Sequence, residues 1–412
     1  GRHAPHAGVT DRDSGMRSMP TTRLEMILAT PVLFTAMEWL RCQGWYFRFS
    51  WLQPGTAYVA SQASQSTYPL VGVYGMTFLT VLVSAGLAYA LLQPERARRL
   101  KALGATAGLV AVLALLFRVA WLTGLSSGGV VAGGAEPVTL AVLMVQSETE
   151  DLDWLIERTR EFAQSRPKLI VWPELAVNDY VTDDPAILGR LQSLAREMQA
   201  TLVLGCKSHV PEGTSTDWLR RRAMMQAEGA LYYNSALTIG PSGDVIGRYH
   251  KRHPIQFFSD GVPGPGYPVF PMPVPERTVP FGVAICYDLD FADTALSLTR
   301  NGAQLLVVPT YDARDWGPVQ QMQHARLALA RAAEVGRCVV RPTSSGVSQI
   351  IAPGGEQLRF IPSGDGGQML GVVDARSYRT LYVRGAWLLP YLCVGVSVLL
   401  LLAALVKRKD RA

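Results

Sequence analysis

The chain has 412 residues, of which 49% are hydrophobic and 17% are charged, and its formal net charge is +6 at pH 7. This length allows one large domain with additional elements. The low share of charged residues is unusual for a soluble protein of this size, and it comes from a few long apolar runs. Much of the positive charge lies beside those runs, so anionic lipid head groups are better expected partners than nucleic acid.

Four apolar runs are candidates for membrane-spanning helices. Val71–Leu92 and Ala386–Val406 carry no charged side chain, and each is long enough as a helix to cross a hydrocarbon core of ~30 Å. Ala102–Leu122 is interrupted by a single Arg, while Met26–Leu40 is shorter and contains a Glu and a Pro. A helix buried in a soluble core is the alternative interpretation of each run, and it is strongest for Met26–Leu40.

Basic residues at the ends of these runs predict their orientation. Arg17 and Arg23 precede the first run, four basic residues lie within 94–101, and Lys407–Arg411 follows the last run. The positive-inside rule assigns all three places to the cytoplasmic side. Residues 43–70 and 124–385 then fall on the outer side, so we expect the large polar part of the chain to face away from the cytoplasm.

Composition divides the chain into four parts. We expect residues 1–23, rich in Gly, Arg, His and Ser, to be disordered, and residues 24–125 to form a membrane domain of about three helices. The Gly/Ser-rich stretch Ser126–Gly134 separates this part from a polar domain at residues 135–382. A last transmembrane helix is expected at residues 386–406.

Short β-rich runs alternate with helical patterns in the polar domain. The expected strands are Val138–Val145, Lys168–Trp172, Leu202–Gly205, Ser235–Ile239, Val279–Cys286, Gln304–Pro309, Cys338–Arg341, Val347–Ile351 and Met369–Val373. The expected helices are Asp153–Gln164, Pro185–Gln199 and Pro318–Glu334, and the expected hairpin turns are Pro241–Asp244 and Pro353–Glu356. Helices between some strands and hairpins between others predict a layered α/β domain with mixed sheets.

Three short motifs carry residues suited to one reaction. Glu174 ends the run Leu169–Glu174, Lys251 lies in the basic segment Tyr249–His253, and Cys286 follows an apolar strand-like run. A thiol can attack a carbonyl, a carboxylate can take the thiol proton, and an ammonium can hold the developing oxyanion. The backbone N–H of Tyr287, directly after the thiol, can add a second donor. Alone, each residue is more often structural; together they predict acyl transfer through a thioester.

In order and local context, these motifs resemble the Glu-Lys-Cys signature of the nitrilase (carbon–nitrogen hydrolase) superfamily. With apolar runs on both sides of the domain, the chain is similar to the membrane-bound branch of that superfamily, the apolipoprotein N-acyltransferases. Other stretches also resemble this branch: Glu38–Arg41, Trp51–Gln53, Gly72–Gly75, Tyr233–Ala236 and His324–Arg331. The resemblance covers about residues 24–405 and implies an α-β-β-α sandwich domain with flanking transmembrane helices.

The resemblance also implies a ping-pong acyltransferase of the bacterial inner membrane, with its catalytic domain on the periplasmic side. Cys286 would take an acyl chain from a phospholipid and pass it to the amine of the diacylglyceryl cysteine that begins an apolipoprotein. No metal or other cofactor is expected, since the thiol chemistry needs none. The alternatives are a membrane-anchored amidase or nitrilase, which passes the acyl group to water, and a non-catalytic membrane scaffold.

Two acidic positions depart from the family pattern. The pattern carries a Glu in a Phe-Gly-Glu segment after the Lys, whereas Asp260 is the nearest acid here. Asp288 stands two residues after the thiol, where Glu is usual. Each change shortens a carboxylate by one methylene, and the scaffold alternative rests on these two residues. The family also has additional membrane spans ahead of the position of Met26, which this sequence does not contain.

Two segments are predicted to form a lid that faces the lipid. The Pro/Gly-rich segment Pro254–Pro280 contains Phe257, Phe258, Tyr267, Phe270 and Met272. Residues 213–232 contain Trp218, Met224 and Met225. Loops of this length are usually functional or disordered, and aromatic rings favour the membrane interface. A mobile surface loop is the alternative for both segments.

The remaining histidines and cysteines carry weaker signals. His250 and His253 have a spacing that metal ligands can use, but no neighbouring cluster completes a metal site. His209 and His324 stand alone and are expected to be structural. The five cysteines show neither metal-ligand nor CxxC spacing, and a disulfide between Cys206 and Cys338 stays open.

Overall fold

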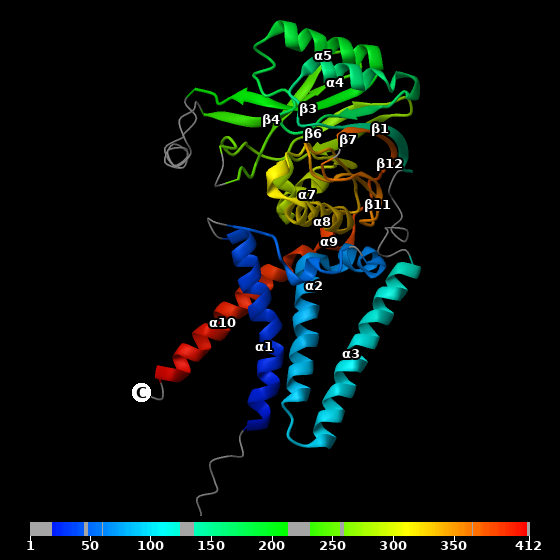
Figure 1. Ribbon diagram of the computed structural model, residues 1–412. Coiled ribbons are helices and arrows are strands. Elements are labelled where there is room, and N and C mark those ends of the chain that lie inside the picture. Colours follow the sequence, from blue (N-terminus) through cyan, green and yellow to red (C-terminus); the bar gives the residue numbers. More distant parts are fainter. Residues whose placement is uncertain are drawn as a thin grey trace, which may run out of the picture.

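The computed structural model describes residues 19–44, 48–59, 61–123, 136–212, 231–255, 259–364 and 366–409. An α/β sandwich stands at one end of a set of long helices, with two sheets in its interior and helices on its outer faces (Figure 1). The α-β-β-α sandwich expected from the resemblance is therefore confirmed.

Each sheet has six strands with a parallel centre and antiparallel edges. The first sheet has the order β12-β1-β2-β3-β4-β5, and the second has the order β11-β10-β9-β8-β7-β6. The strands of the first are β1 (Val138–Gln146), β2 (Leu169–Val171), β3 (Thr201–His209), β4 (Tyr232–Ile239), β5 (Val245–His250) and β12 (Gly367–Ala375). Those of the second are β6 (Val269–Pro273), β7 (Thr278–Val283), β8 (Leu305–Val307), β9 (Cys338–Arg341), β10 (Ser348–Ile351) and β11 (Gln357–Ile361).

Three apolar layers hold the sandwich together. Side chains such as Val142, Val171 and Val283 fill the space between the two sheets. The outer face of the first sheet is covered by α4 (Leu152–Arg160) and α5 (Pro185–Met198). The outer face of the second is covered by α7 (Ala292–Arg300) and α8 (Pro318–Val335). Asp151 and Asp184 cap α4 and α5 by accepting hydrogen bonds from backbone N–H groups, which explains where the two helices begin.

Long helices extend from the sandwich on the side of α8 (Figure 1). They are α1 (Met19–Trp39), α2 (Gln62–Leu91), α3 (Arg96–Leu122) and α10 (Leu389–Lys409), and the short α9 (Leu381–Arg384) leads into α10. Among the described residues, three stretches are long and apolar enough to cross a membrane: Ser66–Leu91, Arg96–Ala120 and Ala386–Val406. The predicted span Met26–Leu40 lies mostly in α1, which is not one of these three. Helix α1 also begins at Met19, inside the segment expected to be disordered.

The second helix layer joins the sandwich to the long helices. Helix α2 is broken at Gly72, whose backbone has φ 67°, and the freed N–H of Val73 donates to the Glu334 carboxylate at 2.7 Å. Glu334 also forms an ion pair with Arg331, which donates to the carbonyl oxygens of Leu289 and Asp290, each at 3.2 Å. Helix α8 therefore connects the break in α2 with the loop that carries Cys286.

The prediction that the whole of Pro254–Pro280 is a lid is wrong for the strand within it. Within Pro254–Pro280, residues Val269–Pro273 form strand β6, which pairs with β7. Phe270 and Met272 are buried in the layer between the sheets because alternate residues of a strand face the same side. Phe257, Phe258 and Trp218 lie outside the described residues, so their role as lid residues stays a prediction.

Candidate active site

Glu174, Lys251 and Cys286 line a single cavity of about 390 Å³. Glu174 follows β2, Lys251 follows β5, and Cys286 begins a short 3₁₀ helix, η4 (Cys286–Asp290), after β7. The three side chains thus come from both sheets and meet where strands end. Each is at least 96% shielded from solvent, since their exposed fractions are 4%, 1% and 2%.

Two carboxylates share two donors on one side of the cavity. Lys251 Nζ lies 2.7 Å from Glu174 Oε1 and 2.7 Å from Asp260 Oδ2. The amide nitrogen of Asn234 donates to the same two carboxylates, again at 2.7 Å each. The backbone N–H of Tyr311 donates to the second oxygen of Glu174 at 2.7 Å. Asp260 thus reaches the Lys and an amide despite being shorter than the Glu of the family pattern.

Burial and charge act in opposite directions on these groups. Burial raises the pKa of Glu174, which makes its carboxylate a stronger base, and the Lys251 ammonium opposes the shift. Burial alone would lower the pKa of Lys251, but the carboxylates of Asp260 and Glu174 outweigh it and keep the pKa well above its ordinary value. Lys251 therefore stays charged and can serve as an oxyanion donor.

Backbone geometry around Cys286 is unusual. Its φ is +50°, a left-handed conformation that non-Gly residues seldom adopt and that clusters at functional sites. The Cys286 N–H donates to the Pro309 carbonyl oxygen at 2.9 Å, and Sγ lies 3.5 Å from the Tyr311 carbonyl oxygen. Burial and the Glu174 carboxylate raise the pKa of the thiol well above its ordinary value, against the effect of Lys251. The resting side chain is therefore a thiol that needs a base.

Gly205 on β3 gives the Glu174 segment its room. A Cβ at this position would lie 2.2 Å from the backbone nitrogen of Leu175 and 2.6 Å from the Glu174 Cα. Leu175 itself has φ +51°. A side chain at position 205 would push the loop of the carboxylate away from the cavity.

Asp288 and Tyr287 act on the loop rather than on the cavity. Asp288 accepts hydrogen bonds from the backbone N–H groups of His253, at 2.6 Å, and Ile285, at 3.0 Å, and from the Tyr249 hydroxyl, at 2.8 Å. The Asp288 carboxylate therefore ties the Cys286 loop to the chain on either side of Lys251. The Tyr287 hydroxyl donates to the Arg48 carbonyl oxygen at 2.9 Å. The role of the Tyr287 backbone N–H stays a prediction.

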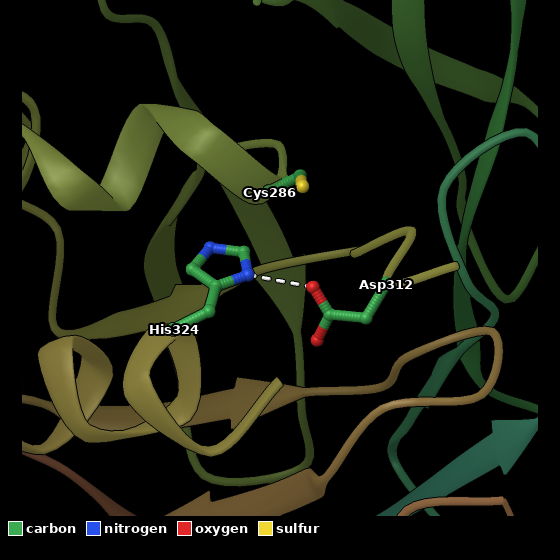
Figure 2. A group of neighbouring side chains, drawn as sticks. All are labelled: Cys286, Asp312 and His324. Carbon is green, nitrogen blue, oxygen red and sulfur yellow. Dashed lines mark hydrogen bonds and ion pairs between the residues drawn. The ribbon is translucent and has the colours of Figure 1, made fainter. Parts of the chain in front are cut away.

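His324, expected to be structural and isolated, lies in a charged cluster beside Cys286. The Asp312 carboxylate lies 2.6 Å from His324 Nδ1 and 2.9 Å from the Arg341 guanidinium. Asp290 lies 3.3 Å from His324 Nε2. One ligand atom from each of Cys286, Asp312 and His324 lies within 4.8 Å of the others, and Figure 2 shows the three side chains pointing toward one space. Such a set can bind a metal, but both imidazole nitrogens already face carboxylates. The buried guanidinium of Arg341 would also repel a metal cation.

Two further predictions concern side chains outside the cavity. The rings of His250 and His253 take part in separate contacts: His250 Nδ1 lies 2.8 Å from the Ser235 hydroxyl, and His253 Nδ1 lies 2.6 Å from Arg48. Cys206 and Cys338 are both buried and unpaired, so the disulfide that the sequence left open is not formed.

Three functional candidates were not identified from sequence. Asn234 belongs to a stretch that resembles the family, but no pattern predicted its contact with Glu174 and Asp260. Tyr311 acts through its backbone, which side-chain chemistry does not reveal. Asp312 belongs to no recognisable motif, and its partners His324 and Arg341 come from other elements.

Comparison with known proteins follows the same division of the chain. The sequence model of the carbon–nitrogen hydrolase family matches residues 138–374, which is more than half of the chain. The chain belongs to the carbon–nitrogen hydrolase family. Residues 14–86 match the apolipoprotein N-acyltransferase N-terminal domain.

Curated relatives match over nearly the full length. The apolipoprotein N-acyltransferase of Methylococcus capsulatus is 28% identical over 90% of this chain and 72% of its own length. That of Azotobacter vinelandii is 29% identical over 93% of this chain and 73% of its own length. Among solved structures, an amidase from Nesterenkonia sp. is 22% identical, covering 63% of this chain and 96% of that chain with a TM-score of 0.44.

Proposed function

We propose that this chain is a membrane-bound N-acyltransferase that acylates apolipoproteins through a thioester on Cys286. The observation that carries the proposal is the meeting of Glu174, Lys251 and Cys286 in one buried cavity. Similarity to apolipoprotein N-acyltransferases over about nine-tenths of the chain supports the acyl acceptor. The long apolar helices beside the sandwich support a phospholipid as the acyl donor.

The first half-reaction forms the thioester. Glu174 takes the thiol proton as Cys286 Sγ attacks the ester carbonyl of a phospholipid, and Lys251 donates to the oxyanion that develops on the carbonyl oxygen. The ester C–O bond then breaks, and the proton passes from Glu174 to the leaving alkoxide of the lysophospholipid. The acyl group stays on Sγ.

The second half-reaction transfers the acyl group to the amine and regenerates the free thiol. The diacylglyceryl cysteine amine of the apolipoprotein attacks the thioester carbonyl and gives up a proton to Glu174. The C–S bond breaks, an amide forms, and the Cys286 sulfur recovers its proton. A thiol suits this sequence because a thioester stores the acyl group and still yields to an amine.

Location is part of the proposal. The chain would be a multi-pass protein of the bacterial inner membrane, with its sandwich on the periplasmic side. Support comes from the α2–α3 connection and the end of α10, both rich in basic residues, which lie at the far end of the long helices from the sandwich (Figure 1). That arrangement brings the cavity to the same side of the membrane as exported lipoproteins.

An acyl-labelled phospholipid tests the proposed function on the full chain in detergent or vesicles. We expect a label on Cys286 that hydroxylamine removes and that moves to the N-terminal amine when a diacylglyceryl lipopeptide is added. Cys286→Ala is the control and should carry no label. Rapid release of free fatty acid without an amine would favour the membrane-anchored hydrolase, and no label on a folded chain would favour the scaffold.

A further inference from the structure

The cluster around His324 sits on the side of Cys286 that the proposed chemistry does not use. Its charged members come from four elements: His324 on α8, Asp312 after β8, Asp290 at the end of η4, and Arg341 on β9. All four side chains are buried, and each is at most 3% exposed. The next charged groups along α8, Arg331 and Glu334, form an ion pair of their own.

The net charge of this cluster depends on one proton. Asp290 and Asp312 contribute two negative charges and Arg341 one positive charge, so a neutral His324 would leave one buried negative charge beside the thiol. An imidazolium brings the cluster to neutrality. Nδ1 lies 2.6 Å from Asp312 and Nε2 lies 3.3 Å from Asp290, while Nδ1 is also 3.0 Å from the Arg341 guanidinium. The two carboxylates outweigh this one cation, which favours a doubly protonated ring.

A residue outside the sandwich core completes the cluster. Trp51, between α1 and α2, donates from its indole nitrogen to the second oxygen of Asp290 at 2.5 Å. The Trp51 ring also stacks over the imidazole, with centroids 5.8 Å apart and planes at 26°. The Trp51 ring thereby keeps water away from the Asp290–His324 pair, and the lower local dielectric strengthens the attraction between the two charges.

We propose that His324 is a positioning residue for the reaction: as an imidazolium it cancels the negative charge of Asp312 beside Cys286 and so makes it easier for Glu174 to take the thiol proton. Figure 2 shows the imidazole and the Asp312 carboxylate converging on the space below the sulfur. The inference deepens the proposed function, because it rests on Cys286 being the nucleophile.

The sign of the pH dependence follows from the charges. Burial alone would lower the pKa of His324, but Asp312 and Asp290 outweigh it and raise the pKa to about 9. Asp312 has its pKa lowered to about 2, since His324 and Arg341 outweigh its burial. The imidazolium is therefore present at neutral pH and is lost as pH rises through about 9. Above that value an uncompensated charge beside Cys286 makes its ionisation harder.

Alkylation of Cys286 by iodoacetamide tests the inference without requiring turnover. The rate is measured at about pH 7 by mass spectrometry of the Cys286 peptide; because the pKa of the thiol lies well above its ordinary value, the rate there is proportional to the small fraction of thiolate. His324→Gln should lower this rate about tenfold or more, which corresponds to a rise of about one unit in the pKa of the thiol. His209→Gln, which removes an exposed imidazole paired with Asp183, is the matched control and should leave the rate unchanged.

The double variant His324→Gln/Asp312→Asn separates charge cancellation from packing. Removing both charges should return the alkylation rate toward that of the unmodified protein, whereas a packing role predicts a further change. An unchanged rate in His324→Gln, or a double variant whose rate does not return, overturns the inference. Alkylation of the buried Cys206 reports unfolding. If His324→Gln unfolds, His324→Lys replaces it: a rate at or above the unmodified value supports the inference, and a lower rate overturns it.

Failure of the two proposals can be told apart. If His324→Gln lowers the alkylation rate as expected but no acyl label appears on the unmodified chain, the charge relation holds and the transferase function fails. If the label appears and His324→Gln leaves the alkylation rate unchanged, the function stands and His324 has a structural role only.

Discussion

Asn234 is the neutral member of the buried network around Glu174. Its amide carries two hydrogens, and each points to a different carboxylate, Glu174 or Asp260, at 2.7 Å. Lys251 bridges the same two groups, so the amide and the ammonium together hold two negative charges close to one another. Without the amide, Lys251 alone would bridge the two carboxylates, and each would keep one backbone donor, the N–H of Tyr311 for Glu174 and that of Ile255 for Asp260.

Replacing Asn234 with Ala should therefore slow thioester formation. Hydrogen bonds to charged groups are worth about 1.5–3 kcal/mol, which corresponds to roughly 10–100-fold in rate. We expect the loss in the single-turnover rate of Cys286 acylation, with little change in the affinity for phospholipid. Asn178→Ala is the matched control, since that amide donates to Glu150 at the edge of the cavity. A rate within about twofold of the unmodified chain would contradict the role assigned to Asn234.

Sequence could identify the reactive residue types but not their full environment. Glu174, Lys251 and Cys286 each follow a recognisable motif, and the structure brings them to one cavity. The doubt over Asp260 came from its length alone, and the fold removes the shortfall by bringing its carboxylate within 2.7 Å of Lys251. The cluster of His324 could not be foreseen because its partners are side chains of other elements that only the folded sheets and helices bring together.

At the scale of elements, prediction failed mainly at the edges of the sheets. All nine predicted strands exist, and the three further strands among the described residues, β5, β6 and β11, are edge strands of the two sheets. Edge strands have one free side and tolerate Pro, as β6 does, so their sequences lack a continuous apolar pattern. In β11 four of five residues are exposed. Helix α7 was also missed.

The link through α8 gives an element-scale prediction. Glu334 accepts the free N–H of Val73 at the break in α2 and pairs with the fully buried Arg331. Glu334→Ala leaves a buried cation unpaired and should cost about 3–5 kcal/mol of unfolding free energy. Glu334→Gln keeps one acceptor oxygen but also removes the negative charge, so it should cost nearly as much. The comparison is made by denaturant unfolding in detergent, with exposure of the buried cysteines as the signal. A loss in Glu334→Gln far below that in Glu334→Ala would contradict the ion pair as the cause.

At the scale of the whole molecule, the arrangement of charge is the main evidence for orientation. The sandwich and the basic ends of the long helices lie at opposite ends of the structure (Figure 1). The four basic residues at the start of α3 are all exposed: Arg96, Arg98, Arg99 and Lys101. The basic end of α10 lies at the same side of the membrane-length helices, so a single orientation satisfies both.

Single-cysteine labelling tests this orientation in cells. Glu95 lies exposed between α2 and α3, and Ser242 lies exposed in the turn between β4 and β5. All five native cysteines are buried, which keeps the background low. A membrane-impermeant maleimide added to spheroplasts should modify Ser242→Cys at once and Glu95→Cys only after the membrane is opened, because basic loops between membrane spans are retained on the cytoplasmic side. The reverse pattern would place the Cys286 cavity in the cytoplasm, away from exported lipoproteins, and would leave water or a cytoplasmic amine as the acyl acceptor.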